Sequence, residues 1–321
     1  MNLDVISCEG ESEKPAVIFI HGLGMNKDIW VNPSNSRVLG EKFPLRILLD
    51  RRLFSDESSF YGESLLGRHA TGASSFQENL RNLQTLFDDF RIKGNTVVTW
   101  SQRRPAGPIA AAVKELGSIV RSTKKMKNNG IILVGHSRGG LIGRKYLSHG
   151  DRSIKGLVTI STPHRGSSVA NVAKYLFPLV SLMDPLIPQG DRGTLSFAVK
   201  RICEFLRSNA LKELRPESAF FRNLKDGPLG WVRYISAGGT NPTLLRIGGI
   251  SIPDILEKVI PEKFYPEELK KGKGDGLVST ESSRIPWSDE HYNFDCNHAE
   301  ILFEKEAREK LGEAINRIVC R

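Results

Sequence analysis

The sequence has little of what marks secreted, membrane-spanning or disulfide-stapled proteins. Its 321 residues include only four cysteines, far apart and without a CxxC pair, which argues against a disulfide framework and a structural zinc site. It contains no uninterrupted apolar run of about 18 residues, so no transmembrane helix is predicted. The first residues, MNLDVISCEGESEKP, carry neither the basic segment nor the apolar segment of a signal peptide. We therefore expect a cytoplasmic protein with reduced thiols.

Acidic residues are in short supply, which gives the chain a basic character. Lys and Arg number 46 against 36 Asp and Glu, so the net charge is +10 and the pI is about 9.5. No nucleic-acid-binding motif accompanies this charge, so we expect no nucleic acid partner. Scattered basic clusters most often form an ordinary solvated surface, and of the two possible anionic partners an anionic membrane, contacted peripherally, is favoured over nucleic acid. The clusters are Arg51–Arg52, Arg103–Arg104, Arg121–Lys127 and Lys270–Lys273.

The remaining composition, 39% hydrophobic and 26% charged, is that of a globular protein with a core. Runs rich in β-branched residues alternate with stretches whose apolar residues recur at helical spacing. The alternation predicts an α/β fold, with a mostly parallel central sheet flanked by helices, in a single domain over residues 1–321. The predicted strands are Ala16–Ile20, Thr96–Trp100, Ile131–Val134, Gly156–Ile160 and Trp231–Ser236, and the predicted helices are Gln77–Phe90, Ile109–Ser122, Gly139–Leu147 and Ala299–Val319.

Two segments interrupt this alternation. Residues 31–75 have weak periodicity and are interpreted as an insertion. Residues 168–224 separate two predicted strands and contain apolar amphipathic stretches broken by prolines. More than fifty residues are too many for a simple connection. We therefore predict a helical cap, or lid, over one end of the sheet, with a fixed apolar layer as the alternative.

A serine stands where a buried strand meets a helix. The stretch IILVGHSRGG carries G-x-S-x-G, with Gly135 two residues before Ser137 and Gly139 two residues after it. Small residues at those positions relieve the crowding of a strained strand-to-helix turn, which exposes the hydroxyl beside a helix N-terminus. The pattern alone also occurs by chance, but the strand before it and the helix after it favour a nucleophilic serine.

Such a serine needs a histidine base and a carboxylate, and in this kind of fold the acid and then the histidine should follow it. His298, in the polar loop DCNHAEIL before the last helix, is the preferred base. Asp275, between two glycines and 23 residues before His298, is the preferred acid, although an ordinary Asp-Gly turn is the plain alternative. The rival acids are Asp254, Asp289 and Asp295, and the other histidines are His21, His69, His136, His149, His164 and His291, of which the last two stay open by position.

An acyl-transfer site also needs an oxyanion hole made of two N–H donors. The amide of Arg138, directly after the serine, is one candidate. The HGLG loop after the first central strand offers the amide of Leu23 as the other, and Gly22 and Gly24 would let an acyl carbonyl approach closely.

Six motifs in order then resemble α/β-hydrolase-fold lipases and esterases, of the bacterial triacylglycerol-lipase type and the related deacylases of glycolipid anchors. They are HGLG, GHSRGG, STPHRGS, LRPESAFFRNL, GDGLV and NHAEI. The resemblance implies Ser137 as nucleophile, Asp275 as acid, His298 as base, and Leu23 with Arg138 as oxyanion donors. It further implies substrate-side positions for His136, Gly22, Gly24 and His164, the last of these being either structural or pocket-lining.

We therefore expect a serine carboxylic-ester hydrolase that acts on an acyl ester, lipid-like in character, with no cofactor and no metal. Asp295, Asn297 and Glu300 could hold calcium, but residues of these types more often hydrogen-bond a loop and cap a helix. The rival functions are an acyltransferase with the same serine, an amidase, and a non-catalytic binding module on the same fold.

Overall fold

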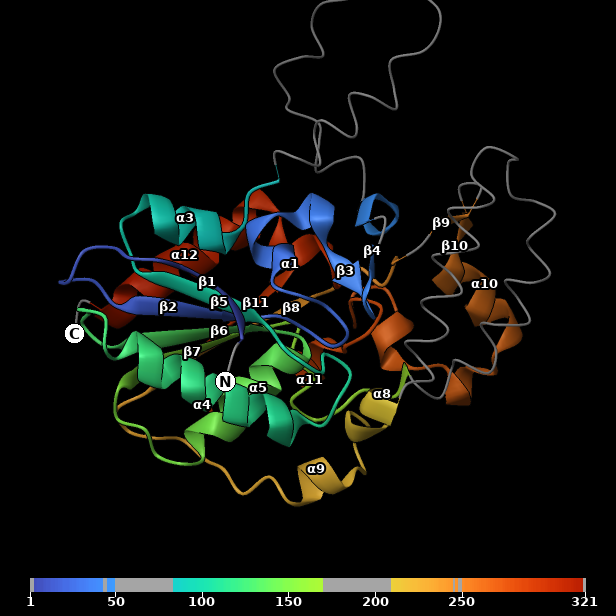
Figure 1. Cartoon of the computed structure of the whole chain (residues 1–321). Coiled ribbons are helices and arrows are strands. Elements are labelled where there is room, and N and C mark those ends of the chain that lie inside the picture. The colour runs from blue at the N-terminus through green and yellow to red at the C-terminus, as the bar shows by residue number, and fades with distance from the viewer. Residues whose placement is uncertain are drawn as a thin grey trace, which may run out of the picture.

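The fold is built on one seven-stranded sheet, seen in a computed structural model that describes residues 3–42, 45–49, 83–169, 209–244, 246–247 and 250–319 (Figure 1). The strand order is β1-β5-β2-β6-β7-β8-β11. All neighbours run parallel except β1, which pairs antiparallel with β5 at one edge. The strands are β1 (Asp4–Cys8), β2 (Ala16–Ile20), β5 (Val97–Ser101), β6 (Ile131–His136), β7 (Ile154–Ile160), β8 (Arg233–Gly239) and β11 (Glu290–Phe294).

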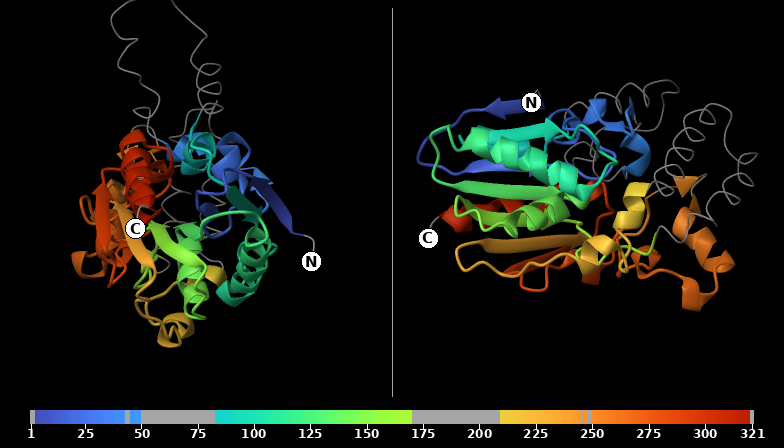
Figure 2. Two further views of the ribbon diagram at one scale, coloured as in Figure 1. Left: turned by 90° about the vertical axis from the view of Figure 1, so that its left-hand side faces the viewer. Right: turned by 60° about the horizontal axis from the view of Figure 1, so that its bottom comes forward.

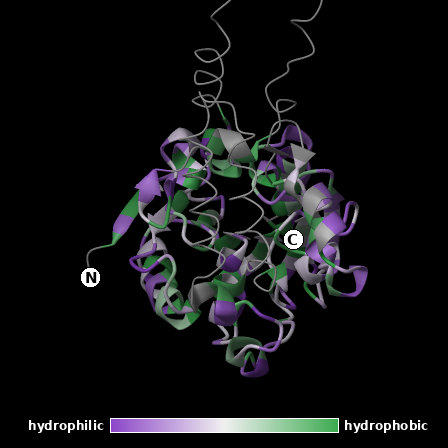
Figure 3. Cartoon of the chain, turned by 90° about the vertical axis from the view of Figure 1, so that its right-hand side faces the viewer, coloured by the Kyte–Doolittle hydropathy of each residue, from purple (hydrophilic) through white to green (hydrophobic). Residues whose placement is uncertain are grey.

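Continuous apolar runs make the central strands. Every residue of β2 and of β6 is buried, because helices cover both faces of the sheet there. Along β2, Ala16, Ile18 and Ile20 enter one core cluster, whereas Val17 and Phe19 enter the other. The sheet thus separates two hydrophobic cores. Hydrophobic and hydrophilic segments alternate along the ribbon (Figure 3).

Helices form a layer on each face of the sheet (Figures 1 and 2). One layer consists of α4 (Ile109–Thr123) and α5 (Arg138–Leu147), and the other of α1 (Asp28–Val31), α3 (Leu86–Ile92) and α12 (Lys305–Val319). This three-layer arrangement confirms the predicted α/β class. Within the described ranges, no helix has both the length and the apolar character needed to cross a membrane.

Two predicted helices begin later than the sequence indicated. Thr85 is the N-cap of α3: its backbone amide bonds the Asp88 carboxylate at 3.3 Å, and its hydroxyl donates to the carbonyl of Trp30 at 2.6 Å. Residues 83–85 are therefore not helical, so a continuous helix over Gln77–Phe90 is wrong. The apolar periodicity continued through the point where side-chain capping starts the helix. Similarly, the last helix begins at Lys305, after the 3-10 turn η9 (Glu300–Leu302).

The edge strands β1 and β11 were not predicted. Their sequences, DVISC and EHYNF, have many polar residues, and most of their residues are partly or fully exposed. An edge strand has only one neighbour to pack against, so it lacks the apolar signal of a central strand.

The two predicted insertions fall largely outside the described residues. Strands β7 and β8 pair directly, so the chain between them does leave the sheet and return beside its starting strand. Residues 170–208, which hold most of the predicted cap, lie outside the description, and the cap stays a prediction. Of residues 31–75, only 31–42 and 45–49 are described, and they contain η1 (Pro33–Asn35), the ribbon β3 (Arg37–Val38) with β4 (Glu41–Lys42), and η2 (Leu45–Leu48).

Short elements complete the described chain. After the predicted cap come α8 (Asn209–Glu213) and α9 (Ala219–Arg222). Beyond β8 follow β9 (Arg246–Ile247), β10 (Ile250–Ser251), α10 (Ile252–Val259), η7 (Glu262–Phe264), η8 (Glu267–Leu269) and α11 (Thr280–Ser283).

Helix α5 begins in very close contact with the sheet. A Cβ added at Gly139 would lie 2.3 Å from the carbonyl oxygen of Ile20, and one added at Gly135 would lie 2.4 Å from the amide nitrogen of Gly140. Because these neighbours are backbone atoms, they cannot move aside. The glycines around Ser137 therefore allow α5 to start directly against β2.

This packing predicts opposite effects for two glycine-to-alanine changes. Gly139→Ala should lower the free energy of unfolding by about 2 to 3 kcal/mol, because the new methyl group collides with β2. Gly117→Ala, in the middle of α4, has its nearest contact at 3.5 Å and should raise the free energy of unfolding by about 0.5 to 1 kcal/mol through helix propensity. Urea denaturation of both variants is the measurement. Equal effects of the two changes would contradict the packing described here.

Candidate active site

The candidate nucleophile occupies a strained turn at the end of β6. Ser137 has φ 53° and ψ −127°, a conformation that a residue with a side chain rarely adopts. Its amide donates to the carbonyl of Ile160 at 2.8 Å, which ties the turn to the end of β7. The predicted strained serine turn is thus present, directly before the first residue of α5.

Asp275 and His298 form a buried pair. His298 Nδ1 lies 3.0 Å from Asp275 Oδ2, and the two side chains are 6% and 0% exposed. The backbone joins them as well, because His298 N–H donates to the Asp275 carbonyl at 2.9 Å. The second carboxylate oxygen accepts from the amides of Leu277 and Val278 at 3.0 and 2.8 Å. This geometry fits a carboxylate that orients a histidine.

The Asp275 carboxylate is stabilised in its ionised form. Burial by itself would raise the pKa of Asp275, but the charge and hydrogen bond of His298, followed by Ser161 and the Leu277 amide, outweigh it and hold the pKa below its usual value. The Ser161 hydroxyl lies near enough to contribute to this shift, yet it forms no hydrogen bond of ordinary geometry with another described residue. We therefore attribute the orientation of Asp275 to His298 and the two amides.

His136 is buried against the candidate base. Its ring centroid lies 4.8 Å from that of His298, and its Nε2–H donates to the His298 carbonyl at 2.9 Å. The residue is fully buried, and burial lowers its pKa to about 3, so the ring is neutral. The expected substrate-binding role is corrected accordingly: His136 links the nucleophile turn to the loop that carries His298.

The glycine loop lies directly beside the serine. A Cβ added at Gly22 would be 3.1 Å from the Cβ of Ser137, so only glycine fits without a shift. Gly24 has φ 72° and donates its N–H to the Pro105 carbonyl at 2.9 Å. Neither the Leu23 amide nor the Arg138 amide donates a hydrogen bond to another residue in the described part of the chain. No competing hydrogen bond within that part of the chain thus opposes the predicted oxyanion role of these two amides, which stays a prediction.

One residue that holds this loop, Gln102, carried no clear signal in the sequence. Gln102, buried after β5, donates its backbone N–H to His21 Nε2 and its side-chain Nε2 to the His21 carbonyl, both at 3.0 Å. The same ring's Nδ1 lies 3.0 Å from the Gly22 carbonyl, which fits a neutral His21 protonated at Nδ1. Burial lowers the pKa of His21 to about 4, in keeping with that neutral form.

His164 belongs to a structural cluster on the α5 side of the sheet. Its Nε2 lies 3.0 Å from the Thr159 hydroxyl, and its carbonyl accepts from Arg144 Nη1 at 3.0 Å. Arg144 also forms a two-point ion pair with Asp226 and stacks on Trp287 at 4.9 Å. Burial first, then the Arg144 charge, lowers the pKa of His164 well below its usual value. Of the two roles that the sequence left open, these contacts indicate the structural one.

The other open candidates are engaged elsewhere. Asp289 pairs with Arg233 and accepts from the Tyr234 amide at the start of β8. His291 bonds Ser236 and Asn293 on β8 and β11. Asp254 lies in the first turn of α10, His149 is exposed after α5, and His69 lies outside the described residues. For Asp295, the fourth acid, no hydrogen bond or ion pair with His298 is found among the described residues.

The loop around His298 is held by hydrogen bonds of its own. Asn297 Oδ1 accepts from the amides of Ala299 and Glu300 at 2.9 and 3.0 Å, and Glu300 accepts in turn from the Asn297 amide at 3.0 Å. Within the described ranges, no group of three or more His, Cys, Asp or Glu side chains is arranged to hold a metal ion. Asn297 and Glu300 thus have a loop-capping role here.

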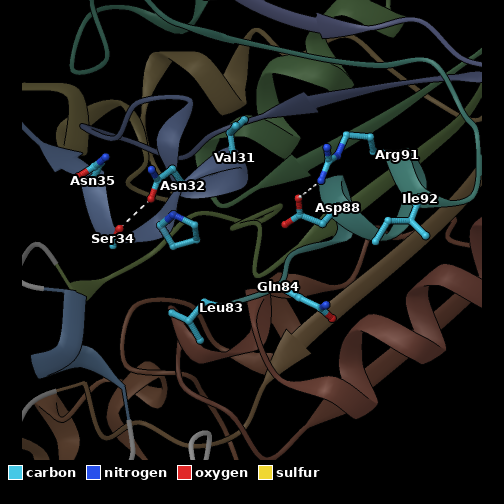
Figure 4. Close-up of a pocket in the computed structure, with 10 residues that line it drawn as sticks. Val31, Asn32, Ser34, Asn35, Leu83, Gln84, Asp88, Arg91 and Ile92 are labelled. Carbon is cyan, nitrogen blue, oxygen red and sulfur yellow. Dashed lines mark hydrogen bonds and ion pairs between the residues drawn. The ribbon is translucent and has the colours of Figure 1, made fainter. Parts of the chain in front are cut away.

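Two clefts among the described residues lie away from the triad. The larger, about 830 Å³, lies between the end of α1, η1 and α3 and is lined mostly by polar side chains (Figure 4). In it Ser34 bonds Asn32 and Arg91 pairs with Asp88. The smaller, about 460 Å³, lies beside α11 and β11 and includes Arg165, Arg284 and His291. Neither is an acyl-binding pocket at Ser137.

The sequence from residue 15 to residue 250 matches the α/β hydrolase fold family. The chain belongs to the α/β-hydrolase family. None of the curated proteins compared with it matches in sequence. Among solved structures, this α/β hydrolase is similar in fold to the lipase BlEst2 of Bacillus licheniformis. For the mature form the TM-score is 0.53 and the identity 14%, with 98% of this chain and 97% of the lipase covered. For the propeptide form the TM-score is 0.52 and the identity 14%, with 97% of this chain and 53% of the lipase covered.

The buried neutral histidines of this α/β hydrolase predict acid sensitivity. Because the folded-state pKa values of His21 and His136, about 4 and about 3, lie below the ordinary 6.5, the unfolded chain binds more protons in the window between. Stability should therefore fall as the pH drops below about 6.5, by up to about 1.4 kcal/mol per pH unit for each histidine. Urea denaturation between pH 4.5 and 7.5 measures the slope, and His21→Gln should make it shallower.

The exposed His149 supplies the control for this experiment. His149→Gln should follow the wild-type slope. If His21→Gln also followed it, the neutral buried state of His21 would be contradicted.

Proposed function

We propose that the protein is a serine carboxylic-ester hydrolase that works through an acyl-enzyme on Ser137. The observation that carries this proposal is the buried Asp275–His298 pair, at 3.0 Å, on a loop attached to the nucleophile turn through His136. A strained serine, an oriented imidazole and two amides without a partner among the described residues are the parts that acyl transfer requires.

The steps follow from the roles of these groups. His298 Nε2 takes the proton of the Ser137 hydroxyl while Oγ attacks the ester carbonyl, and the oxyanion receives the amides of Leu23 and Arg138. The tetrahedral intermediate collapses, the C–O bond to the alcohol breaks, and His298 gives its proton to the leaving alkoxide. A water, deprotonated by His298, then attacks the carbonyl of the acyl-enzyme. The bond between that carbon and Ser137 Oγ breaks, His298 returns the proton to Oγ, and the carboxylic acid leaves. Asp275 stabilises the imidazolium in both halves of the reaction.

The proposed substrate is an acyl ester of lipid-like character. The sequence of residues 168–224 is apolar and broken by prolines, which suits an acyl-binding cap that opens at a lipid surface. The lipase that shares this fold is a further reason to test acyl chains first. An acyltransferase would use the same acyl-enzyme and differ only in the acceptor, an alcohol in place of water.

Labelling and turnover test the triad together. Wild type should react with a fluorophosphonate probe and hydrolyse p-nitrophenyl esters of graded chain length. Ser137→Ala and His298→Ala should lower kcat by at least about 1,000-fold, and Asp275→Asn by about 100- to 10,000-fold, because the imidazole loses its orienting carboxylate. His149→Gln, at an exposed histidine, is the matched control and should keep full activity.

The outcomes separate the rival functions. A wild type that takes no label and hydrolyses no ester would contradict the proposed hydrolase activity and favour a non-catalytic binding module. Ester products formed with added alcohols would identify an acyltransferase, and cleavage of p-nitroanilides in preference to esters an amidase. The chain-length optimum reports the size of the acyl pocket.

We further propose that the basic surface around the site attracts an anionic membrane. The exposed Arg103 and Arg104 follow β5, and the exposed Lys271 and Lys273 precede Asp275. Both segments stand at the carboxyl edge of the sheet, as Ser137 does. Lysines near an anionic bilayer contribute about 1 kcal/mol each to binding.

Two charge-matched double variants test this contact. Lys271→Glu with Lys273→Glu should weaken binding to phosphatidylserine-containing vesicles by at least about 10-fold. Lys125→Glu with Lys127→Glu changes the net charge equally, but at the amino edge of the sheet, and should bind like wild type. Vesicle co-sedimentation at low and high salt is the measurement. Equal losses in both variants would show that only net charge matters.

A further inference from the structure

The side chain of Arg138 crosses from the nucleophile helix to the loop after β5. Although it carries a charge, the residue is fully buried. Its Nη1 donates to Gln102 Oε1 at 2.7 Å and lies 3.4 Å from the Pro105 carbonyl, and its Nη2 donates to the Gly107 carbonyl. One guanidinium thus fastens three points of the loop spanning residues 102–107.

That loop in turn holds the glycine loop beside Ser137. Gln102 bonds the carbonyl and the ring of His21, each at 3.0 Å. Pro105, which faces Arg138 Nη1, also accepts the amide of Gly24 at 2.9 Å. Leu23, the second candidate oxyanion donor, lies between these two anchored residues. A continuous set of hydrogen bonds therefore runs from the Arg138 side chain to both sides of Leu23.

The buried charge has compensation nearby. Burial lowers the pKa of Arg138 to about 10, while the carboxylates of Glu213 and Glu115 act in the opposite direction, so the guanidinium is protonated at neutral pH. Glu115 is occupied by Trp100 Nε1 and the Arg103 amide, and Glu213 by the Ile109 amide. The guanidinium of Arg138 therefore bonds carbonyl and side-chain amide oxygens rather than these carboxylates.

We propose that the Arg138 side chain is a positioning residue for the oxyanion hole, acting through Gln102 and Pro105 on the Leu23 amide. This inference rests on the proposed ester hydrolysis for its catalytic consequence. Arg138 would contribute twice: its backbone N–H is one oxyanion donor, and its side chain sets the distance to the other. Lysine could not replace it, because a single ammonium cannot reach carbonyls on both sides of the loop in a fixed plane.

Substitutions at this position isolate the side chain, since every variant keeps the backbone N–H. We would compare Arg138→Lys and Arg138→Met with wild type. Gln102→Leu serves as a second route, because it removes the side-chain bonds to Arg138 and to the His21 carbonyl and leaves the buried cation in place. Arg144→Met is the matched control: it is another buried arginine of α5, but it pairs with Asp226 on the side of His164.

Two readouts separate positioning from general destabilisation. Hydrogen–deuterium exchange of the peptide covering residues 19–25 reports the Gly24–Pro105 contact without any need for catalysis. It should quicken by at least about 10-fold in the Arg138 and Gln102 variants. In the same variants kcat for p-nitrophenyl esters should fall by about 10- to 100-fold with little change in KM, because the misplaced amide serves the transition state. Arg144→Met should lower Tm yet leave both readouts as in wild type.

The proposal is overturned if the rate of hydrogen–deuterium exchange over residues 19–25 is the same in Arg138→Met as in Arg144→Met. It is also overturned if this exchange quickens in the Arg138 variants while their kcat stays at the wild-type value. A wild type that neither labels nor hydrolyses esters would remove the catalytic consequence, yet the exchange comparison would still decide whether Arg138 holds the loop. If the Arg138 variants do not fold, Gln102→Leu supplies the same comparison.

Discussion

The backbone of Ser137 is the constraint on which the rest of the site depends. A residue with a side chain at φ 53° costs about 1 to 3 kcal/mol and persists only where its surroundings determine it. Here those surroundings are a buried strand before the serine, a helix that starts against β2 after it, and a hydrogen bond to the end of β7. The glycines of the turn make this packing possible, because their neighbours are backbone atoms that cannot move.

Buried polar side chains extend that constraint from the turn to the surrounding loops. His136 reaches the loop of His298, and Arg138 reaches the loop of Gln102. Each of these two side chains has at least one hydrogen bond to a distant segment, which offsets part of the cost of burial, although His136 Nδ1 and Arg138 Nε have no such partner among the described residues. The residues on either side of Ser137 therefore contact the two halves of the candidate site: His136 contacts the loop of the base, and Arg138 contacts the loop that holds the oxyanion loop.

The central layers and the main site residues were predictable because they leave local marks in the chain. Buried parallel strands appear in the sequence as apolar runs, and the serine turn is marked by glycines two residues before and two residues after the serine. The edge strands, the start of α3 at Leu86 and the role of Gln102 left no such marks. The edge strands depend on pairing with a neighbouring strand. The start of α3 depends on a side-chain cap, which apolar periodicity does not report, and the role of Gln102 depends on a contact with His21 from another segment. His136 was misjudged for the same reason, since its partner lies 162 residues away.

By itself, the sequence determined the α/β class, the strained serine turn and the candidate acid and base, because spacing along one chain is enough to encode each of them. Tertiary structure alone decided which side chains meet. Four aspartates could have served His298, and the fold brought Asp275 to 3.0 Å. The structural roles of His164 and His136 depend on tertiary contacts: Arg144 of α5 bonds the carbonyl of His164, and His136 bonds the carbonyl of His298. A parallel sheet gathers loops from distant crossovers at its carboxyl edge, so the pairing of those loops is set by packing and by the need to satisfy buried polar groups.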